Sequence, residues 1–464
     1  MPRKRTILTG WILACLIAAA LGADRAPAQF KDGDTVCVIG DSITHGGKYQ
    51  KFVYLFYATR FPDRKIRMVN CGISGDTAAG AVRRFEWDIA PHKPTVATIL
   101  LGMNDVGRGY YGKDKTDEAS RKRQQEAIDR YAENMKQLAQ LLKKAKCEII
   151  FLTPTIYEQV AEMETPNDFG VNDALGACGA EGKKLAKKHR AGVVDVWAMM
   201  NEVSAGHQKD DATFTIVGKD RVHPGDVGHF IVAYAILKAQ GIPPCVSKMA
   251  IDAKKGKATE ETNCKISALK ASETEVVFDC LENALPYPVA EAERPALELA
   301  PFEKELNQEV LIVDGLAPGT YELAIDDSAV GEYSAEQLKA GINLADIPDT
   351  PQHKQAVEVQ KLNDLRHSLE SGRIRVLAQM RHGVLSAQNI DPDNFETAKK
   401  ALLDKLEQMK AENSKYYNYY KGQTERYLEC KPKEKETIKE WEEAITGMYE
   451  VNKPKPHRFV IRKK

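Results

Sequence analysis

The stretch Thr35-Val36-Cys37-Val38-Ile39-Gly40-Asp41-Ser42 joins a short apolar run to a polar turn that contains glycine. Apolar runs of this length, bounded by turn residues, are typical of buried strands in parallel sheets. The strand candidates of this kind are Thr35–Ile39, Ile66–Asn70, Thr95–Leu101, Cys147–Thr153 and Val193–Val196. Because helical stretches separate them, the sequence predicts an α/β layer fold with a mainly parallel sheet.

The helical stretches complete this first folding unit. They are expected around Tyr49–Arg60, Thr77–Trp87, Glu118–Lys146, Asp173–His189 and Gly228–Ala239. The pair Pro243-Pro244 then ends the unit. A single hydrophobic core stops growing at about 250 to 300 residues, whereas the chain has 464. We therefore assign residues 31–244 to the α/β domain and expect further units after it.

After residue 244 the pattern changes twice. From 245 to 350, short alternating runs such as Glu275–Phe278 are divided by turn signals at Asp314-Gly315 and Pro318-Gly319, which predicts a small β-rich domain. From 351 to 464 the sequence predicts a helical region, with apolar helix faces that need a partner surface. A tyrosine-rich segment at 416–420 either packs its rings against a neighbour, which is the default expectation, or stacks on sugars.

The first 28 residues differ in kind from the rest of the chain. Arg3-Lys4-Arg5 precedes an apolar run from Ile7 to Leu21, and Ala26-Pro27-Ala28 supplies small residues for a cleavage site. The apolar run is shorter than the ~20 residues that a membrane span needs, which favours cleavage over an uncleaved anchor. We therefore expect a signal peptide at residues 1–28, a secreted or periplasmic protein, and no membrane span after cleavage.

Composition and charge are those of an ordinary globular protein, with 43% hydrophobic and 28% charged residues. The formal net charge is +0, and removal of residues 1–28 takes away four basic residues and one acidic residue, which leaves about −3. This charge does not suggest a nucleic-acid partner. The sequence does not indicate an oligomeric state.

Nine cysteines are present, and all but one lie beyond the predicted signal peptide. Cys37 and Cys147 fall in apolar, strand-like runs, which favours buried free thiols. An exported protein permits disulfides, and Cys264 with Cys280 is the preferred bridge. No Cys-x-x-Cys pair or His-x-x-x-His spacing indicates a metal site, and no cofactor is expected.

Polar motifs follow the strand candidates at their carboxyl ends. They are Gly40-Asp41-Ser42, Ser74-Gly75-Asp76 and Gly102-Met103-Asn104-Asp105, and a fourth motif, Asp220-Arg221-Val222-His223-Pro224, precedes the last helix of the unit. The carboxyl ends of parallel strands meet at one edge of a sheet, where loops converge over a rigid base. We therefore expect the four motifs to build one site.

Ser42, His223 and Asp220 have the residue types of an acyl-transfer triad. A serine hydroxyl is a poor nucleophile unless a base lies within hydrogen-bond reach, and that base needs a third group to orient it. His223 suits the base, and an aspartate three residues earlier can fold back on the ring and fix its tautomer. The oxyanion that forms during attack needs donors, which the Ser42 amide, the Gly75 amide and the Asn104 carboxamide can supply.

In this order, the four motifs resemble the sequence blocks of the SGNH hydrolase superfamily, also called the GDSL esterase and lipase family. The matching blocks are Gly40–Thr44, Asn70–Thr77, Gly102–Asp105 and Asp220–His223, and the name-giving residues correspond to Ser42, Gly75, Asn104 and His223. The resemblance covers residues 31–244 and implies a flavodoxin-like three-layer α/β/α fold with a shallow, exposed site. Ile43 stands where the family name has Leu, and this exchange of one apolar residue for another leaves the mechanism untouched.

Together these features predict a secreted serine esterase that hydrolyses short acyl esters. Secretion and the resemblance to secreted acetylesterases favour O-acetyl esters on carbohydrates, and no long apolar loop between the motifs offers a tunnel for a long acyl chain. The expected partner is thus a small-molecule or glycan ester. Two alternatives stay open: a transacylase that delivers the acyl group to a sugar hydroxyl, and a glycan-binding or adhesion protein whose C-terminal half carries the main role.

Other polar residues near the motifs have ordinary explanations. His45 and His229 either line the cleft or take surface or capping roles. Arg83, Arg84 and Trp87 follow the second motif on a helix, where an exposed charged face is expected.

Overall fold

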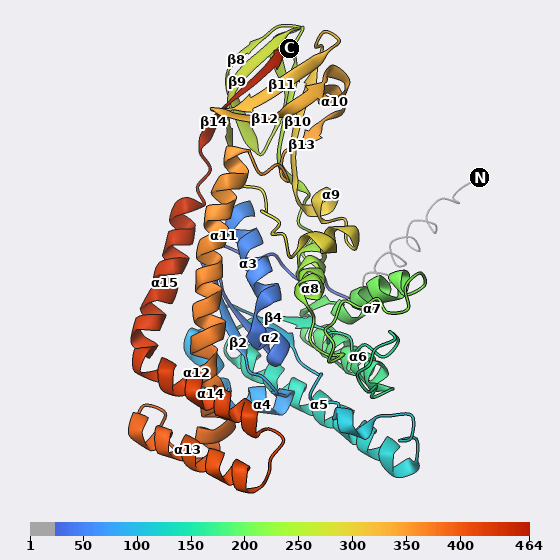
Figure 1. The fold of residues 1–464 in the computed structure, drawn as a ribbon, viewed down its shortest axis with the longest axis vertical. Coiled ribbons are helices and arrows are strands. Elements are labelled where there is room, and N and C mark those ends of the chain that lie inside the picture. Colours follow the sequence, from blue (N-terminus) through green and yellow to red (C-terminus); the bar gives the residue numbers. More distant parts are fainter. Residues whose placement is uncertain (1–23) are drawn as a thin grey trace, which may run out of the picture.

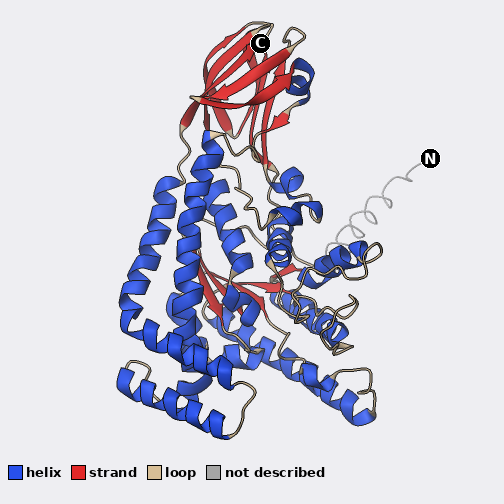
Figure 2. Cartoon of the chain, viewed as in Figure 1, coloured by secondary structure: helices blue, strands red, loops and turns tan. Residues whose placement is uncertain are grey.

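The computed structural model describes residues 24–464, so most of the predicted signal peptide lies outside the described residues. The molecule is elongated, with an α/β layer in its middle, a β-rich part at one end and long helices along one side (Figure 1). Figure 2 shows that the strands gather in two separate places, the α/β layer and the β-rich part. Within residues 24–464, no helix is both long and apolar enough to cross a bilayer.

A five-stranded parallel sheet forms the base of the α/β layer, with the strand order β2-β1-β3-β4-β5. The strands are β1 (Thr35–Gly40), β2 (Arg67–Gly72), β3 (Val96–Leu100), β4 (Glu148–Leu152) and β5 (Gly192–Val194). The predicted α/β fold is confirmed. Several strand boundaries differ by one or two residues, and the last predicted strand runs too far because Val196 begins a helix whose first turn is capped by the Asp195 side chain.

Seven helices of the α/β layer follow its strands. They are α2 (Ser42–Gly46), α3 (Lys48–Arg60), α4 (Ala78–Arg83), α5 (Glu118–Lys144), α6 (Val171–His189), α7 (Val196–His207) and α8 (Asp226–Ala239). Helix α3 packs on α8, and α5 packs on α4 and α6. After α4 the chain continues as the π-helical turn η1 (Phe85–Ile89) and the short η2 (Ala90–His92). The predicted helices omit α7 and also α2, whose five residues are too few to show a helical period.

Two sheets form the β-rich part, with the strand orders β13-β10-β6-β7 and β12-β11-β14-β9-β8. Their strands are β6 (Cys245–Asp252), β7 (Lys257–Thr262), β8 (Cys264–Ala271), β9 (Glu275–Glu282), β10 (Gln308–Asp314), β11 (Thr320–Ile325), β12 (Ser328–Ser334), β13 (Ile342–Asn343) and β14 (Pro456–Lys463). Strand β14 comes from the end of the chain, inside the segment predicted to be helical, and pairs antiparallel with both β9 and β11. The domain boundaries at residues 244 and 350 stay predictions.

The helical region packs against the α/β layer. It contains α11 (Pro351–Leu369), η5 (Glu370–Ile374), α12 (Arg375–Met380), η6 (Arg381–Leu385), α13 (Phe395–Ala411), α14 (Tyr417–Cys430) and α15 (Glu434–Val451). Helix α11 lies against both α3 and α15, and its buried Ala356 and Val359 join the main hydrophobic core. Phe302, from the connection between β9 and β10, packs edge-on against Phe230 of α8. The main core therefore draws on four separate stretches of sequence, which are the α/β layer, the β9–β10 connection, α11 and α15.

The structure bears on two further expectations, one about the cysteines and one about the tyrosine-rich segment. All eight cysteines of the described residues are free thiols, and Cys37 and Cys147 are buried as predicted. The preferred Cys264–Cys280 bridge is wrong, because both residues are free thiols, with Cys264 opposite Glu282 in the β8–β9 register. In the tyrosine-rich segment, Tyr420 packs against a core cluster of the helical region and Tyr419 packs edge-on against Tyr420, whereas Tyr416 is 55% exposed.

Candidate active site

Ser42 lies where β1 ends and α2 begins, at the carboxyl edge of the parallel sheet. The Asp41 side chain caps this short helix and accepts a hydrogen bond from the Ile43 amide at 3.0 Å. Glycine is required at position 40, since a Cβ there would lie 2.0 Å from the Thr44 hydroxyl oxygen. The tight turn therefore fixes the direction in which the Ser42 side chain leaves the sheet.

A chain of hydrogen bonds runs from Ser42 to Asp220. Ser42 Oγ lies 2.8 Å from His223 Nε2, and Nδ1 of the same ring is bonded to Asp220 Oδ2. Asp220 Oδ1 also accepts the His223 amide at 3.0 Å. Burial acts to raise the pKa of Asp220, but the hydrogen bonds from His223 outweigh it and hold this pKa below its ordinary value. Asp220 is therefore ionised at neutral pH and orients the imidazole toward Ser42.

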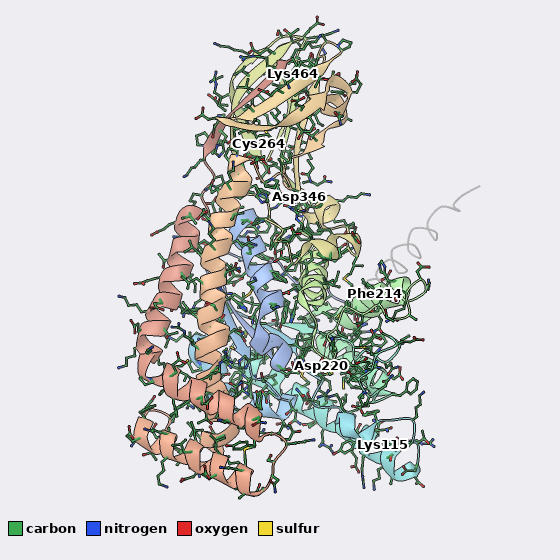
Figure 3. All side chains as sticks on the ribbon, in the orientation of Figure 1. Lys115, Phe214, Asp220, Cys264, Asp346 and Lys464 are labelled. Carbon is green, nitrogen blue, oxygen red and sulfur yellow. The ribbon has the colours of Figure 1, made fainter. Side chains whose placement is uncertain are left out.

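Arg221 holds the loop between Asp220 and His223. Its backbone φ is +65°, in the left-handed region that few non-glycine residues adopt. Its side chain is buried and donates hydrogen bonds to the carbonyl oxygens of Glu158, Ala161, Met163 and Thr165. These bonds tie the loop to a neighbouring segment and stabilise the strained conformation. Figure 3 places Asp220 in the α/β layer, far from Cys264 and Lys464 of the β-rich part.

The two other predicted site residues flank the Ser42 turn. Gly75 follows β2 and Asn104 follows β3, and these strands lie on either side of β1. Gly75 is exposed and has a φ of +79°, which favours glycine at this position. Ser42 is the first residue of α2, where a backbone amide has no acceptor within the helix. Asn104 Nδ2 donates to the backbone oxygen of Asp76 at 2.9 Å, so the structure brings all four motifs to one edge of the sheet.

Comparisons with known proteins agree with this arrangement. A family model described as GDSL-like lipase/acylhydrolase matches residues 36–236. Residues 36–236 belong to this family. An acetylxylan esterase of Geobacillus stearothermophilus is 29% identical over 224 residues, which are 45% of this chain and 94% of the relative. Esterase TesA of Pseudomonas aeruginosa is 37% identical over 103 residues, which are 21% of this chain and 48% of the relative.

One solved structure matches well beyond the family domain. It is a gut microbial diltiazem-metabolizing enzyme, with 30% identity, a TM-score of 0.87, and an alignment that covers 95% of this chain and 100% of the other. The β-rich part and the helical region therefore have counterparts in another protein. With the family match and the esterase relatives, the chain is a carboxylic ester hydrolase of the GDSL type.

A buried ionic network lies behind the Gly75 loop of this esterase, and the sequence reasoning missed it. Arg84 Nε donates to Asp76 Oδ2 at 2.7 Å, and Arg84 Nη1 is bonded to Asp88. Arg84 is 0% exposed, so the prediction of an exposed position is wrong for it and holds for its neighbour Arg83. The spacing of four residues between Arg84 and Asp88 was the local signal for this pair.

The second arginine of the network comes from the helical region. Arg375 of α12 donates two hydrogen bonds to the Asp88 carboxylate, at 2.7 and 2.9 Å, and one to the backbone oxygen of Gly72 at 3.0 Å. Burial acts to raise the pKa of Asp88, but the charges of Arg375 and Arg84 outweigh it and hold this pKa far below its ordinary value. Nothing in the sequence near Asp88 points to Arg375.

The two histidines near the motifs are both buried, so neither takes the surface role that was one of the two expectations. Burial lowers the pKa of His45 to about 3 and that of His229 also to about 3, so both rings are neutral at physiological pH. The His45 ring accepts the Ser74 amide at 3.3 Å, and His229 stacks on Tyr49. Both rings therefore support the loops around Ser42.

Two buried carboxyl groups complete the surroundings of the site. Burial raises the pKa of Asp41 to about 7 and that of Asp105 to about 7. Asp105 accepts the Ala78 amide at 2.9 Å and so links the third motif to the start of α4. In residues 24–464, no group of three or more His, Cys, Asp or Glu side chains is placed to hold a metal ion.

Proposed function

We propose that this protein is an exported serine esterase that removes acetyl groups from carbohydrate esters, with Ser42 as nucleophile, His223 as general base and Asp220 as orienting acid. The observation that carries the proposal is the hydrogen-bonded chain from Ser42 through His223 to Asp220. The apolar leader supports export. The alignment with an acetylxylan esterase over 94% of that relative supports the acetyl substrate.

The proposed reaction begins when Ser42 Oγ attacks the ester carbonyl carbon while His223 Nε2 takes its proton. The carbonyl oxygen then becomes an oxyanion, which accepts hydrogen bonds from the Ser42 amide, the Gly75 amide and the Asn104 carboxamide. The ionised Asp220 stabilises the imidazolium. Collapse of the intermediate breaks the bond to the alcohol oxygen, and the departing alcohol takes the proton from His223. The acyl group stays bonded to Ser42.

Water completes the cycle by the same route. His223 removes a proton from a water molecule, the resulting hydroxide attacks the acyl carbonyl, and the same donors hold the second oxyanion. Collapse returns the proton to Ser42 and releases the carboxylic acid. Exposure of the His223 and Asp220 side chains, at 47% and 52%, supports an open site that a bulky alcohol can approach.

The decisive test is a panel of acetylated oligosaccharides, diltiazem and model aryl esters of increasing acyl length, assayed with the wild type and Ser42→Ala. We expect acetate release from acetylated sugars, a fall in kcat/KM as the acyl chain lengthens, and no turnover by Ser42→Ala. Diltiazem belongs in the panel because of the full-length match to a diltiazem-metabolizing enzyme. Rapid cleavage of long-chain esters without acetate release from any sugar would rule out the proposed substrate class.

A transacylase uses the same residues with a sugar hydroxyl in place of water. Product analysis separates the two reactions: hydrolysis yields free acetate in proportion to the alcohol released, even when unacetylated sugar is in excess. Acetylated acceptor in place of free acetate would show transfer instead.

A further inference from the structure

Asp76 connects two of the three proposed oxyanion donors. It follows Gly75 directly in the chain, and its own amide donates to the Ile73 backbone oxygen at 3.1 Å, which closes a turn around the Gly75 amide. Its backbone oxygen accepts the hydrogen bond of Asn104 Nδ2 at 2.9 Å and so fixes the carboxamide. Any displacement of Asp76 therefore moves the Gly75 amide and the Asn104 carboxamide together.

Two basic side chains hold the Asp76 carboxylate in place. Arg84 Nε lies 2.7 Å from Oδ2, and His382 Nε2 lies 3.3 Å from Oδ1. The carboxylate is 1% exposed and the His382 side chain 15% exposed. Burial acts to raise the pKa of Asp76, but the contact with His382 and the charge of Arg84 outweigh it and hold this pKa below its ordinary value. The carboxylate is thus clamped on both oxygens.

The side chains of Asp76 and His382 pack tightly against Gly80. A Cβ on Gly80 would lie 1.6 Å from Asp76 Oδ1 and 3.1 Å from His382 Nε2, so both side chains rest directly on this glycine. His382 also lies beside Trp87. The position of His382 is therefore defined by close packing as well as by its contact with Asp76.

His382 belongs to η6 of the helical region, outside the part of the chain that the family model matches. The same segment makes other contacts with the loops of the site. Ser371 Oγ donates to the backbone oxygen of His45, which lies in α2 with Ser42, and Glu370 accepts the Asn70 amide at 2.9 Å. Residues 370–382 therefore contact the loops of both the first and the second motif.

We propose that His382 is a positioning residue of the esterase: through the Asp76 carboxylate it holds the Gly75 and Asn104 donors at the distance that the oxyanion requires. The proposal rests on the oxyanion role proposed above for these donors. It makes the helical region part of the active site, because the family domain supplies only Arg84 to the Asp76 clamp. His382 acts through Asp76 and does not itself touch the substrate.

Loss of this contact should affect the transition state more than the bound ester. The oxyanion exists only during reaction, so poorly placed donors lower kcat and kcat/KM equally and leave KM unchanged. Complete removal of one donor costs about 10²- to 10³-fold in kcat. Loosening two donors without removing them is expected to cost about 10- to 100-fold.

The test compares the full-length variants His382→Ala, His382→Gln and His457→Ala, with kcat and KM measured on one acetyl ester. Gln keeps an N–H donor near Asp76, so we expect it to recover most of the kcat that Ala loses. His457 is the matched control, since it lies 2.7 Å from Asp326 and is similarly buried, but in the β-rich part. His457→Ala should keep the wild-type kcat even where its melting temperature falls.

Each other outcome overturns the proposal. A kcat within about two-fold of wild type in His382→Ala, a raised KM at unchanged kcat, or equal losses in the Ala and Gln variants would each exclude a positioning role. If His382→Ala does not fold, His382→Met fills a similar volume without a donor and must show the same kcat loss. Ser42→Ala is assayed in parallel: turnover there would refute the proposed nucleophile, whereas an inactive Ser42→Ala beside a fully active His382→Ala would refute only the positioning role.

Discussion

Two histidine–aspartate pairs lie at the same edge of the sheet and differ in almost every physical respect. In the pair His223–Asp220 both side chains are about half exposed, at 47% and 52%, and both come from one loop. In the pair His382–Asp76 the side chains are 15% and 1% exposed and come from distant parts of the chain. The first pair has Ser42 within hydrogen-bond distance, and the second has the buried guanidinium of Arg84.

The difference shows that the same two residue types can transfer protons in one pair and hold neighbouring groups in place in the other. An exposed imidazole beside a hydroxyl can exchange protons with a substrate and with water. An imidazole packed over Gly80 and Trp87 has no such access and can only fix the group that it contacts. Variants of the exposed pair should therefore cost more activity than variants of the buried pair.

The largest effect is expected at the exposed pair and its nucleophile. Ser42→Ala or His223→Ala removes a group that makes or breaks bonds, and in comparable triads such changes cost about 10⁴- to 10⁶-fold in kcat. The fold should survive, because His223 is exposed. Steady-state kinetics beside a thermal melt checks both points. Wild-type-like kcat in either variant would show that the exposed pair has no chemical role.

Asp220→Asn should come next, with a loss of about 10²- to 10⁴-fold in kcat. The hydrogen bonds from His223 hold the pKa of Asp220 below its ordinary value, so the wild-type carboxylate is charged throughout the neutral range. Asn removes this charge, leaves the imidazolium without its stabilising partner and permits the wrong tautomer. A kcat at the level of Ser42→Ala would mean that the aspartate is as essential as the nucleophile, against the expected order.

The buried pair is tested from its packing side by Gly80→Ala. The added Cβ meets Asp76 Oδ1 at 1.6 Å, so the carboxylate must move away from His382. We expect kcat to fall about 10- to 100-fold with little change in KM, because the two donors tied to Asp76 move with it. Gly206→Ala in α7 is the control, since a Cβ there meets nothing within 4 Å. An unchanged kcat in Gly80→Ala would show that the donors do not depend on Asp76.

The same contrast explains what the sequence could predict. Strand periods and turn residues are local, so Thr35–Ile39 and the motif around Ser42 were recognisable, and so was the three-residue spacing from Asp220 to His223. Parallel strands necessarily bring such motifs to one edge. The buried pair has no local pattern, because His382 and Arg375 reach the second motif only through the packing of the helical region. Strand β14 was missed for the same reason: its partners β9 and β11 lie far away in sequence.

The smallest effect is expected in the β-rich part, where a buried carboxyl group lacks the basic partner that Asp76 has. Glu309 is 0% exposed, and neither of its carboxyl oxygens has a hydrogen-bond partner among residues 24–464. Burial, and then the neighbouring Glu282, raises the pKa of Glu309 well above its ordinary value. Two carboxyl groups that share one buried site cannot both ionise at low cost.

The sign of the pH dependence follows from this raised pKa. Glu309 binds its proton more tightly in the folded state than in the unfolded state, so its stabilising contribution is complete below the unfolded pKa of about 4.3 and is lost as pH rises toward the folded value. Glu309→Gln removes the titrating group, so its free energy of unfolding should exceed that of the wild type by about 1–3 kcal/mol under alkaline conditions. The melting temperatures of the wild type and Glu309→Gln, measured in assay buffers set between about pH 5 and pH 9, should therefore diverge as pH rises. The kcat should stay the same, because Glu309 lies far from Ser42. Parallel curves would mean that the Glu282–Glu309 pair does not retain its proton. A charged carboxylate would then be buried here without basic partners of the kind that Arg84 and His382 provide for Asp76.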